Sequence, residues 1–271
     1  MKYVCALTIA GSDCSGGAGI QADIKTMSAL GVYAASAITA VTVQNTKGVA
    51  SVVPIDADTV AGQVRAVMED IHPGAVKIGL VPVKDTFTTL KDVLYASKTT
   101  PLVIDPVMVA TSGDRLMSSD AIDTFIHTLL PLASLLTPNI PEAEVLAGIK
   151  ICSAEDINEA ARRILALGCK AVLVKGGHIL GEEKTDRLYS DCRLIDTYSA
   201  KTVPTRNTHG TGCTLSSAIT AYLARGLNIR EAVEAAKIYL HSALTAGAEV
   251  KIGSGHGPVN HFFNPEKLII R

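Results

Sequence analysis

The sequence predicts an α/β protein in which a mostly parallel sheet is covered by helices on both faces. Apolar stretches typical of buried strands alternate along the 271 residues with stretches of helical spacing. Hydrophobic residues make up 48% of the chain and aromatic residues only 4%, and Ala, Val, Ile and Gly are frequent. This composition is typical of parallel strands buried under helices. No linker, repeat or low-complexity tract divides the sequence, so we expect one domain over residues 1–271.

The first half of the chain repeats the strand and helix patterns four times. We expect strands over residues 3–11, 36–45, 75–81 and 101–108, and helices over residues 20–31, 56–71, 84–97 and 118–133. Gly31 is suited to follow the end of the first helix, where a left-handed conformation is common. Asp56 and Ser118 stand where helix caps are expected.

The second half continues the alternation and adds an edge. We expect strands over residues 134–139 and 170–177, and helices over residues 141–148, 153–168, 212–225 and 230–250. Pro141 suits a first helical position, and Ser153 begins a Ser-x-x-Asp cap. Residues 181–205 are polar and short-stranded, which indicates an antiparallel meander at the edge of the sheet. Ligands of such sheets bind at the carboxyl ends of the strands.

Charge, hydropathy and cysteine spacing exclude several classes of protein. The net charge of −1 argues against nucleic-acid binding or a polybasic membrane surface. No segment reaches the roughly 18 apolar residues of a membrane span, and the start lacks a signal-peptide cleavage site, so we expect a cytoplasmic protein. Without a C-x-x-C pair, neither a zinc knuckle nor a disulfide framework is indicated. The cysteines are Cys5, Cys14, Cys152, Cys169, Cys192 and Cys213.

The glycine-rich segment GSDCSGGAG follows the first predicted strand. Gly11 and Gly16 have the spacing of a P-loop, but Gly17 and Ala18 stand where that motif needs Lys and Ser or Thr. A dinucleotide fingerprint from Gly17 also fails, because residues 24–55 contain no Asp or Glu to hold a ribose. The segment is therefore either backbone that approaches a small ligand or a tight turn between strand and helix.

Gln44 and Asn45 follow the second apolar strand. A primary amide offers a donor beside an acceptor, which matches the amino group and neighbouring ring nitrogen of an aminopyrimidine. The alternative is a strand-end turn stabilised by Asn45.

Carboxylates and an amide follow two later strands. Asp105 ends the strand LVID, while Asn139 and Glu142 flank a helix start in TPNIPEAE. Mg²⁺ takes one or two carboxylates and leaves its other positions to water and phosphates, so this group suits a Mg–nucleotide. Taken singly, Asp105 is better explained as a turn former and Glu142 as a helix-start charge.

The segment NTHGTGC leads into a helix pattern and places Cys213 where that helix begins. Backbone N–H groups at a helix start lack internal partners and carry the positive end of the helix dipole. Gly210, Thr211 and Gly212 can therefore present amides to an anion such as phosphate. The same surroundings favour a thiolate, so we expect a depressed pKa for Cys213.

Taken together, these segments resemble a known family. The hydroxymethylpyrimidine and phosphomethylpyrimidine kinases of thiamin biosynthesis have, in the same order, segments similar to GSDCSGGAGIQADIKTMSALGVY, QNTKGV, KIGL, IDPVMVATSGD, TPNIPEAE, VKGGH, NTHGTGCTLSSAI and GPVNHF. The resemblance runs from near Ala10 to near Phe262. Two departures are Cys14, where the family commonly has Pro, and Leu80, where Met is common.

The resemblance implies a ribokinase-like three-layer α/β/α sandwich. It also implies phosphorylation of 4-amino-5-hydroxymethyl-2-methylpyrimidine and then of its monophosphate with Mg–ATP. In such a kinase Gln44 would hydrogen-bond to the amino edge of the pyrimidine. Thr42 lies two residues before Gln44, so both side chains point to the same face of the strand. The other residues that match the family's pocket lining are Gly11, Ala18, Leu80 and Val107.

The resemblance gives Cys213 a catalytic role. Ribokinase-like enzymes generally carry Asp at this position as the base that takes the proton of the attacking hydroxyl, and this branch typically has Cys. The amides of residues 210–213 would hold the oxygens of the transferring phosphoryl group, and Mg²⁺ near Asp105 and Glu142 would neutralise charge.

Four further residues have weaker signals. Lys175 before GGH either approaches nucleotide phosphates or is solvated, and Lys237 on the last helix either reaches the nucleotide or stays on the surface. Asp23 either faces the substrate loop or supports a cap. His209 beside the anion turn is either an acid or a turn histidine that donates to backbone.

Two rival functions follow from the same residues. A pyridoxal kinase on this scaffold would not need Gln44, because pyridoxal has no amino group at that edge. A non-catalytic pyrimidine-binding module would not need the set formed by Asp105, Asn139, Glu142 and the anion turn. We expect no nucleic-acid or membrane partner, and the resemblance suggests a homodimer.

Overall fold

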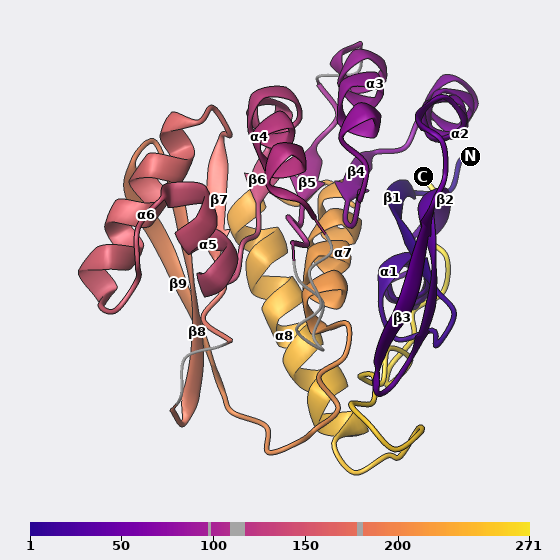
Figure 1. Ribbon diagram of the computed structural model, residues 1–271. Helices are drawn as coiled ribbons and strands as arrows, with labels where there is room; N and C mark the ends of the chain where they lie inside the picture. Colours follow the sequence, from indigo (N-terminus) through magenta and orange to yellow (C-terminus); the bar gives the residue numbers. More distant parts are fainter. Residues whose placement is uncertain (97–98, 109–116, 178–180) are drawn as a thin grey trace.

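The computed structural model describes residues 1–96, 99–108, 117–177 and 181–271. In this part of the chain a nine-stranded sheet has the order β3-β2-β1-β4-β5-β6-β7-β8-β9 (Figure 1). Its parallel strands are β1 (Cys5–Asp13), β2 (Tyr33–Asn45), β4 (Ala75–Ile78), β5 (Leu102–Ile104), β6 (Leu135–Leu136) and β7 (Ala171–Val174). Antiparallel strands extend both edges: β3 (Gly48–Pro54), β8 (Glu183–Ser190) and β9 (Arg193–Lys201). The predicted parallel sheet and edge meander are confirmed.

Helices cover both faces of this sheet. One face packs against α2 (Ala57–Asp70), α3 (Lys84–Tyr95), α4 (Ser119–Thr128), α5 (Ile140–Ala147) and α6 (Ala154–Ala166), and a short 3₁₀ turn (Leu130–Leu132) follows α4. The other face packs against α1 (Gly19–Ala29), α7 (Thr211–Ala224) and α8 (Ile229–Gly247). Each face has its own hydrophobic core, so the three-layer α/β/α sandwich is confirmed.

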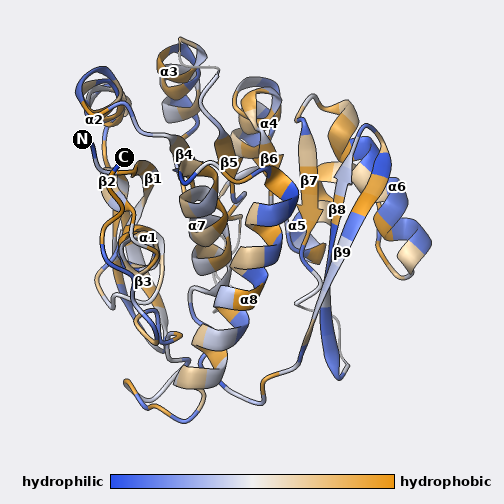
Figure 2. Ribbon diagram, turned by 180° about the vertical axis from the view of Figure 1, so that it is seen from behind, coloured by the Kyte–Doolittle hydropathy of each residue, from blue (hydrophilic) through white to orange (hydrophobic). Residues whose placement is uncertain are grey.

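The pleat of the strands divides the apolar residues between the two cores. In β4, Val76 and Ile78 belong to the core under α2–α6, while Ala75 belongs to the core under α1, α7 and α8. Strands β5, β6 and β7 are mainly hydrophobic, whereas α6 and α8 alternate hydrophobic and hydrophilic residues (Figure 2). Lys77 interrupts the apolar run of β4 although it is fully buried.

The predicted helix signals act as expected at several ends. Gly31 follows α1 with φ +71°, the Oδ1 of Asp56 accepts from the N–H of Thr59 at 2.8 Å, and Ser153 forms a capping box with Asp156. Pro141 is the second rather than the first residue of α5, because that helix begins at Ile140.

Some element bounds differ from the predictions. Strand β3 was not predicted, because it is a largely exposed edge strand without a clear apolar pattern. Strand β5 ends before Asp105 and Pro106, and α4 ends before the 3₁₀ turn that contains Pro131. Helix α8 ends at Gly247, whose carbonyl accepts from Asn207 Nδ2 at 2.7 Å. The predicted end of α3 at residue 97 lies outside the described residues.

The chain ends lie side by side near β1 and β2 (Figure 1). The N–H of Lys2 donates to the carbonyl of Arg271 at 2.6 Å, and Tyr3 bridges to Ile270. Within the described ranges, the structure has no helix that is both long and apolar enough to cross a membrane.

Candidate active site

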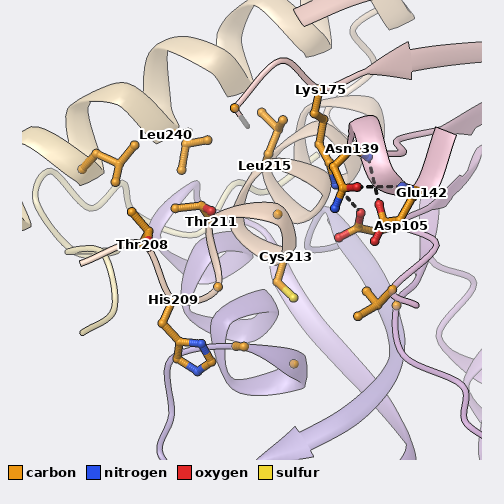
Figure 3. A pocket seen from close by; sticks show the side chains of 18 of the residues that line it. Asp105, Asn139, Glu142, Lys175, Thr208, His209, Thr211, Cys213, Leu215 and Leu240 are labelled. Atoms are coloured by element: carbon orange, nitrogen blue, oxygen red, sulfur yellow. Dashed lines mark hydrogen bonds and ion pairs between the residues drawn. The ribbon is translucent and has the colours of Figure 1, made fainter. Parts of the chain in front are cut away.

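A cavity of about 760 Å³ opens at the carboxyl ends of the parallel strands, where α7 begins. All the residues predicted for the site line it except Asp23. They are Gly11, Ala18, Thr42, Gln44, Leu80, Asp105, Val107, Asn139, Glu142, Lys175, Gly210, Thr211, Gly212, Cys213 and Lys237. In Figure 3, Cys213 lies between a charged group formed by Asp105, Glu142 and Lys175 and the ring of His209.

The start of α7 is a tight turn over residues 210–213, the segment predicted to bind an anion and called the anion turn. Gly210 has φ +76°, and a methyl group there would overlap the carbonyl oxygen of Gly17, so only glycine fits. The N–H of Thr214 closes the first helical bond to Gly210 at 2.8 Å, while the N–H of Thr211 turns to the carbonyl of Thr208 at 3.3 Å. Thr211 therefore does not offer the free amide that the sequence predicted. The N–H groups of residues 212 and 213 remain without an intrahelical acceptor and can bind an anion.

A charged cluster lies directly beside this turn. Lys175 Nζ is 2.6 Å from Asp105 Oδ1, and a methyl group on Gly212 would lie 3.4 Å from both Asp105 Oδ2 and Lys175 Nζ. The Thr137 hydroxyl also donates to Asp105 Oδ1 at 3.2 Å. Burial opposes the ionisation of Asp105, but Lys175 and Lys77 outweigh it and hold the pKa of the carboxyl below its ordinary value. Asp105 is therefore an anion that faces the anion turn.

Asn139 and Glu142 are held by the start of α5. Asn139 Oδ1 accepts from the N–H of Glu142 at 2.9 Å, and Glu142 Oε2 accepts from the N–H of Asn139 at 2.9 Å. Burial and the negative charge of Asp105 together raise the pKa of Glu142 to about 7, against the lowering influence of Lys175. This carboxylate would gain from a nearby cation.

These carboxylates fit Mg²⁺ that is carried by a nucleotide. The described ranges contain no group of three or more His, Cys, Asp or Glu side chains arranged as a ready-made metal site. Mg²⁺ needs only one or two protein carboxylates when water and phosphates supply its other oxygens. Asp105 and Glu142 supply that number, and the raised pKa of Glu142 is the electrostatic condition that a cation would relieve.

The thiol of Cys213 does not have the predicted pKa. Burial raises the pKa to about 11. Lys77 and an amide hydrogen bond from Gly19 lower it, while Asp23 and Asp105 raise it. The expectation of a depressed pKa is wrong for the ligand-free protein, because the loss of solvation outweighs the favourable groups. At neutral pH the sulfur is a thiol.

The opposite end of the cavity is mostly apolar. Gly11 and Leu80 are in close contact, since a methyl group on Gly11 would lie 3.1 Å from Leu80 Cδ2. Val107 lines the same cavity. Polar side chains at this end include Thr42 and Gln44 on β2, whose Oγ1 and Oε1 atoms are 3.2 Å apart. Such a lining suits a neutral ring that is oriented by one amide.

Asp23 does not contact the cavity. Its side chain is fully buried and pairs with Lys77 Nζ at 2.6 Å and 2.7 Å. The hydroxyls of Thr8 and Ser217 also donate to it. The prediction that Asp23 binds substrate is therefore wrong in this structure. A carboxylate on the inner face of α1 has to satisfy a buried lysine, and sequence spacing did not reveal that partner.

Sequence reasoning missed two carboxylates in the cavity. Asp13 ends β1 and accepts from His209 Nε2 at 2.8 Å, and Asp186 on β8 pairs with Lys237 Nζ at 2.7 Å. The signal for Asp13 was its position at the end of an apolar strand, which is also what identified Asp105. Asp186 lies in the polar meander, where nothing in the pattern distinguishes it from surface charges. Residues 109–114 of IDPVMVATSGD and residue 178 of VKGGH lie outside the described residues.

Comparison with known proteins gives consistent matches over almost the whole chain. The family model described as phosphomethylpyrimidine kinase matches residues 13–260. A hydroxymethylpyrimidine/phosphomethylpyrimidine kinase of Rhizobium meliloti is 51% identical over 260 residues, which cover 95% of this chain and 96% of that protein.

Solved structures agree with the sequence matches. The crystal structure of phosphomethylpyrimidine kinase from Clostridium difficile has a TM-score of 0.78 and 47% identity, and the match covers 89% of this chain and 99% of that one. An ADP complex of Bacillus subtilis pyridoxal kinase has a TM-score of 0.88 and 35% identity, with coverage of 96% and 98%.

Proposed function

Because the chain belongs to the phosphomethylpyrimidine kinase family, we propose that it phosphorylates 4-amino-5-hydroxymethyl-2-methylpyrimidine and then the resulting monophosphate, with ATP as the donor. The observation that carries this proposal is the division of one cavity into two ends. One end has apolar walls and the amide of Gln44, and the other has the anion turn of α7 beside Asp105 and Lys175. A ring with a hydroxymethyl group fits the first end, and phosphates fit the second.

The two reactions differ in their nucleophile. In the first, the hydroxymethyl oxygen forms a bond to the γ-phosphorus, the bond from that phosphorus to ADP breaks, and the hydroxyl proton leaves. In the second, an oxygen of the monophosphate attacks and is already anionic, so no base is needed. The N–H groups of residues 212 and 213, which lack an intrahelical acceptor, can hold oxygens of the transferring group in both reactions.

Asp105 and Glu142 would hold Mg²⁺ that arrives with the nucleotide, and Asn139, Lys175 and Lys237 would contact the nucleotide. Mg²⁺ would supply charge neutralisation to the phosphates when bound. The position of Lys175 beside Gly212 supports its assignment. The ion pair of Lys237 with Asp186 at the cavity wall supports the assignment of Lys237. The capping box fixes Asn139 and Glu142 before any ligand binds.

Cys213 would act as the base of the first reaction. Its place at the start of α7, between the two ends of the cavity, supports this role (Figure 3). Because the resting thiol has a pKa of about 11, it has to lose its proton before it can accept one from the substrate. The base would therefore assist a reaction in which positioning and electrostatics supply most of the catalysis.

A second candidate function is the phosphorylation of pyridoxal. The observation that favours it is the similarity to the Bacillus subtilis pyridoxal kinase, whose TM-score exceeds that of the Clostridium difficile relative. The higher identity to the pyrimidine kinases and the exposure of Gln44 to the cavity favour the pyrimidine instead.

The test is product analysis with Mg–ATP and the purified protein, given the hydroxymethylpyrimidine and pyridoxal in parallel. We expect the pyrimidine to appear first as the monophosphate and then as the diphosphate, with pyridoxal much slower. Faster conversion of pyridoxal would overturn the proposal. We also propose a homodimer, on the family resemblance, and light scattering of the purified protein tests it directly.

A further inference from the structure

A small polar network closes the apolar end of the cavity. His209 Nε2 is 2.8 Å from Asp13 Oδ2 and 3.4 Å from Gln44 Nε2, and the other atom of that amide, Oε1, is 3.2 Å from Thr42 Oγ1. All four residues line the cavity. The proposed function uses Gln44 but gives no role to Asp13 and His209.

Asp13 can only accept hydrogen bonds. Its carboxylate accepts from the N–H groups of Ser15, Gly17 and Ala18 at 2.9, 3.2 and 2.9 Å. Burial opposes ionisation, but hydrogen bonds from His209 and Ser15 lower the pKa of Asp13 to about 2. An ionised carboxylate at 2.8 Å from a ring nitrogen requires a proton on that nitrogen. His209 Nε2 is therefore a donor.

This donor decides how the Gln44 amide is oriented. A protonated Nε2 has no lone pair to offer to the Gln44 NH₂ group. A half-turn of the amide exchanges oxygen and nitrogen with almost no change in shape, so the hydrogen-bond network assigns the two atoms. With the oxygen on the His209 side, the NH₂ group faces Thr42. The Thr42 hydroxyl already donates to the carbonyl of Ser12 at 3.0 Å, so its oxygen is free to accept.

We propose that His209, held by Asp13, is a specificity-determining positioning residue that fixes the Gln44 amide with its carbonyl oxygen on the His209 side. In this orientation Gln44 accepts from a substrate amino group beside His209 and donates to a ring nitrogen on the Thr42 side. Both amide atoms keep one free position after their protein contacts are made. This inference rests on the proposed function, because it explains how Gln44 recognises an aminopyrimidine.

The backbone of His209 is anchored independently of its ring. Its N–H donates to the carbonyl of Gly257 at 3.1 Å, and the residue bridges to Pro258. The following residue, Gly210, is fixed by its contact with Gly17. A change of the His209 side chain therefore leaves the anion turn in place.

The test compares two His209 variants on two substrates. His209→Leu removes the donor and keeps a bulky side chain, and His209→Gln keeps an N–H close to the position of Nε2. We would measure kcat/KM for 4-amino-5-hydroxymethyl-2-methylpyrimidine and for its analogue with hydrogen in place of the amino group. We expect a wild-type preference of about tenfold or more for the amino substrate, because a substrate without the amino group leaves the carbonyl oxygen of Gln44 unpaired. His209→Leu should lose most of this preference, and His209→Gln should keep it within about twofold.

The outcomes separate the inference from the proposed function. If the wild type phosphorylates neither pyrimidine, the proposed function fails. If the wild type is active and His209→Leu keeps the preference while both rates fall, His209 is merely structural and the inference is overturned. Equal wild-type rates on both substrates overturn it as well.

A measurement on the wild type covers the case in which His209→Leu does not fold. Long-range ¹H–¹⁵N spectra of the imidazole report which ring nitrogen carries the proton. We expect protonated Nε2 at neutral pH. An unprotonated Nε2 could accept from the Gln44 NH₂ group, and the inference would then be wrong.

Discussion

Two of the lysine–carboxylate pairs in this protein have the same separation but differ in whether they border the cavity. Lys77 and Asp23 are 2.6 Å apart and both side chains are 0% exposed, while Lys175 and Asp105 are 2.6 Å apart and 12% and 3% exposed. Hydroxyls donate to the carboxylate of each pair, but only the second of these two pairs lines the cavity, beside Gly212. The comparison teaches that access to a ligand, and not pairing itself, separates a charge that serves function from one that serves the fold.

The largest loss of stability should come from breaking the fully buried pair of Lys77 and Asp23. Lys77→Met leaves Asp23 as an uncompensated charge between α1 and β4, so we expect the free energy of unfolding to fall by about 3–5 kcal/mol. Urea unfolding followed by circular dichroism measures it. The matched control is Lys175→Met, which leaves Asp105 in reach of cavity water and should cost much less stability.

A double variant sharpens this prediction. Lys77→Met with Asp23→Leu removes both buried charges and should recover at least half of the lost stability, because no unpaired ion remains. A loss below about 1 kcal/mol in Lys77→Met alone would contradict the assignment of this pair to the fold.

The pair of Lys175 and Asp105, called the open pair below because it borders the cavity, should affect activity more than stability. Asp105→Asn keeps the shape of the side chain but removes the negative charge that would hold Mg²⁺ near the phosphates, so kcat/KM for the first phosphorylation should fall about 1000-fold. Steady-state assays with Mg–ATP measure it, and urea unfolding should show a smaller loss of stability than Lys77→Met, because Lys175 borders the cavity. A variant that is unstable rather than inactive would place Asp105 with Asp23, among the charges that serve the fold.

The same comparison explains how far the sequence could go. The parallel strands and the strand-end residues Gln44, Asp105 and Lys175 were predictable, because ligands of open α/β sheets bind where strands end. Asp23 was mispredicted because its partner Lys77 lies 54 residues away on another element. Short-range patterns do not show which buried side chains face each other across two layers.

The pKa of Cys213 could not be predicted for a related reason. The helix start and its amides are visible in the sequence and favour a thiolate. The burial that raises the pKa, and the charges of Asp23 and Asp105 that add to it, depend on tertiary packing. The position of Cys213 at a helix start therefore predicted the direction of one contribution to its pKa but not the net shift.

Cys213 also allows the two reactions to be compared. Cys213→Ala should slow the first phosphorylation about 100-fold, because the neutral hydroxyl loses its base, and should slow the second less than about threefold. Single-turnover assays started from the hydroxymethylpyrimidine or from its monophosphate measure the two steps separately. Cys213→Asp should retain the first step. Equal losses in both steps would leave the sulfur as packing beside the anion turn.

The smallest effect should appear in the reactivity of the same thiol. Because the pKa of Cys213 is raised to about 11, its alkylation by iodoacetamide in the ligand-free protein should rise about tenfold per pH unit through pH 10. An ordinary thiol, with a pKa of about 8.5, levels off earlier, and the urea-unfolded protein should follow that curve as the control. A plateau of the folded protein below pH 9 would contradict the raised pKa.

The contribution of Asp105 to the pKa of Cys213 can be measured on the same alkylation curve. Asp105 raises the pKa of Cys213, so Asp105→Asn should move the alkylation curve to lower pH by less than about one unit. Mass spectrometry of the peptide that contains Cys213 measures the shift. If the curve moves, the open pair acts on the sulfur through its charge as well as on the nucleotide. If it does not move, the charge of Asp105 does not act on the sulfur, and the raised pKa depends on burial and on the charges of Lys77 and Asp23.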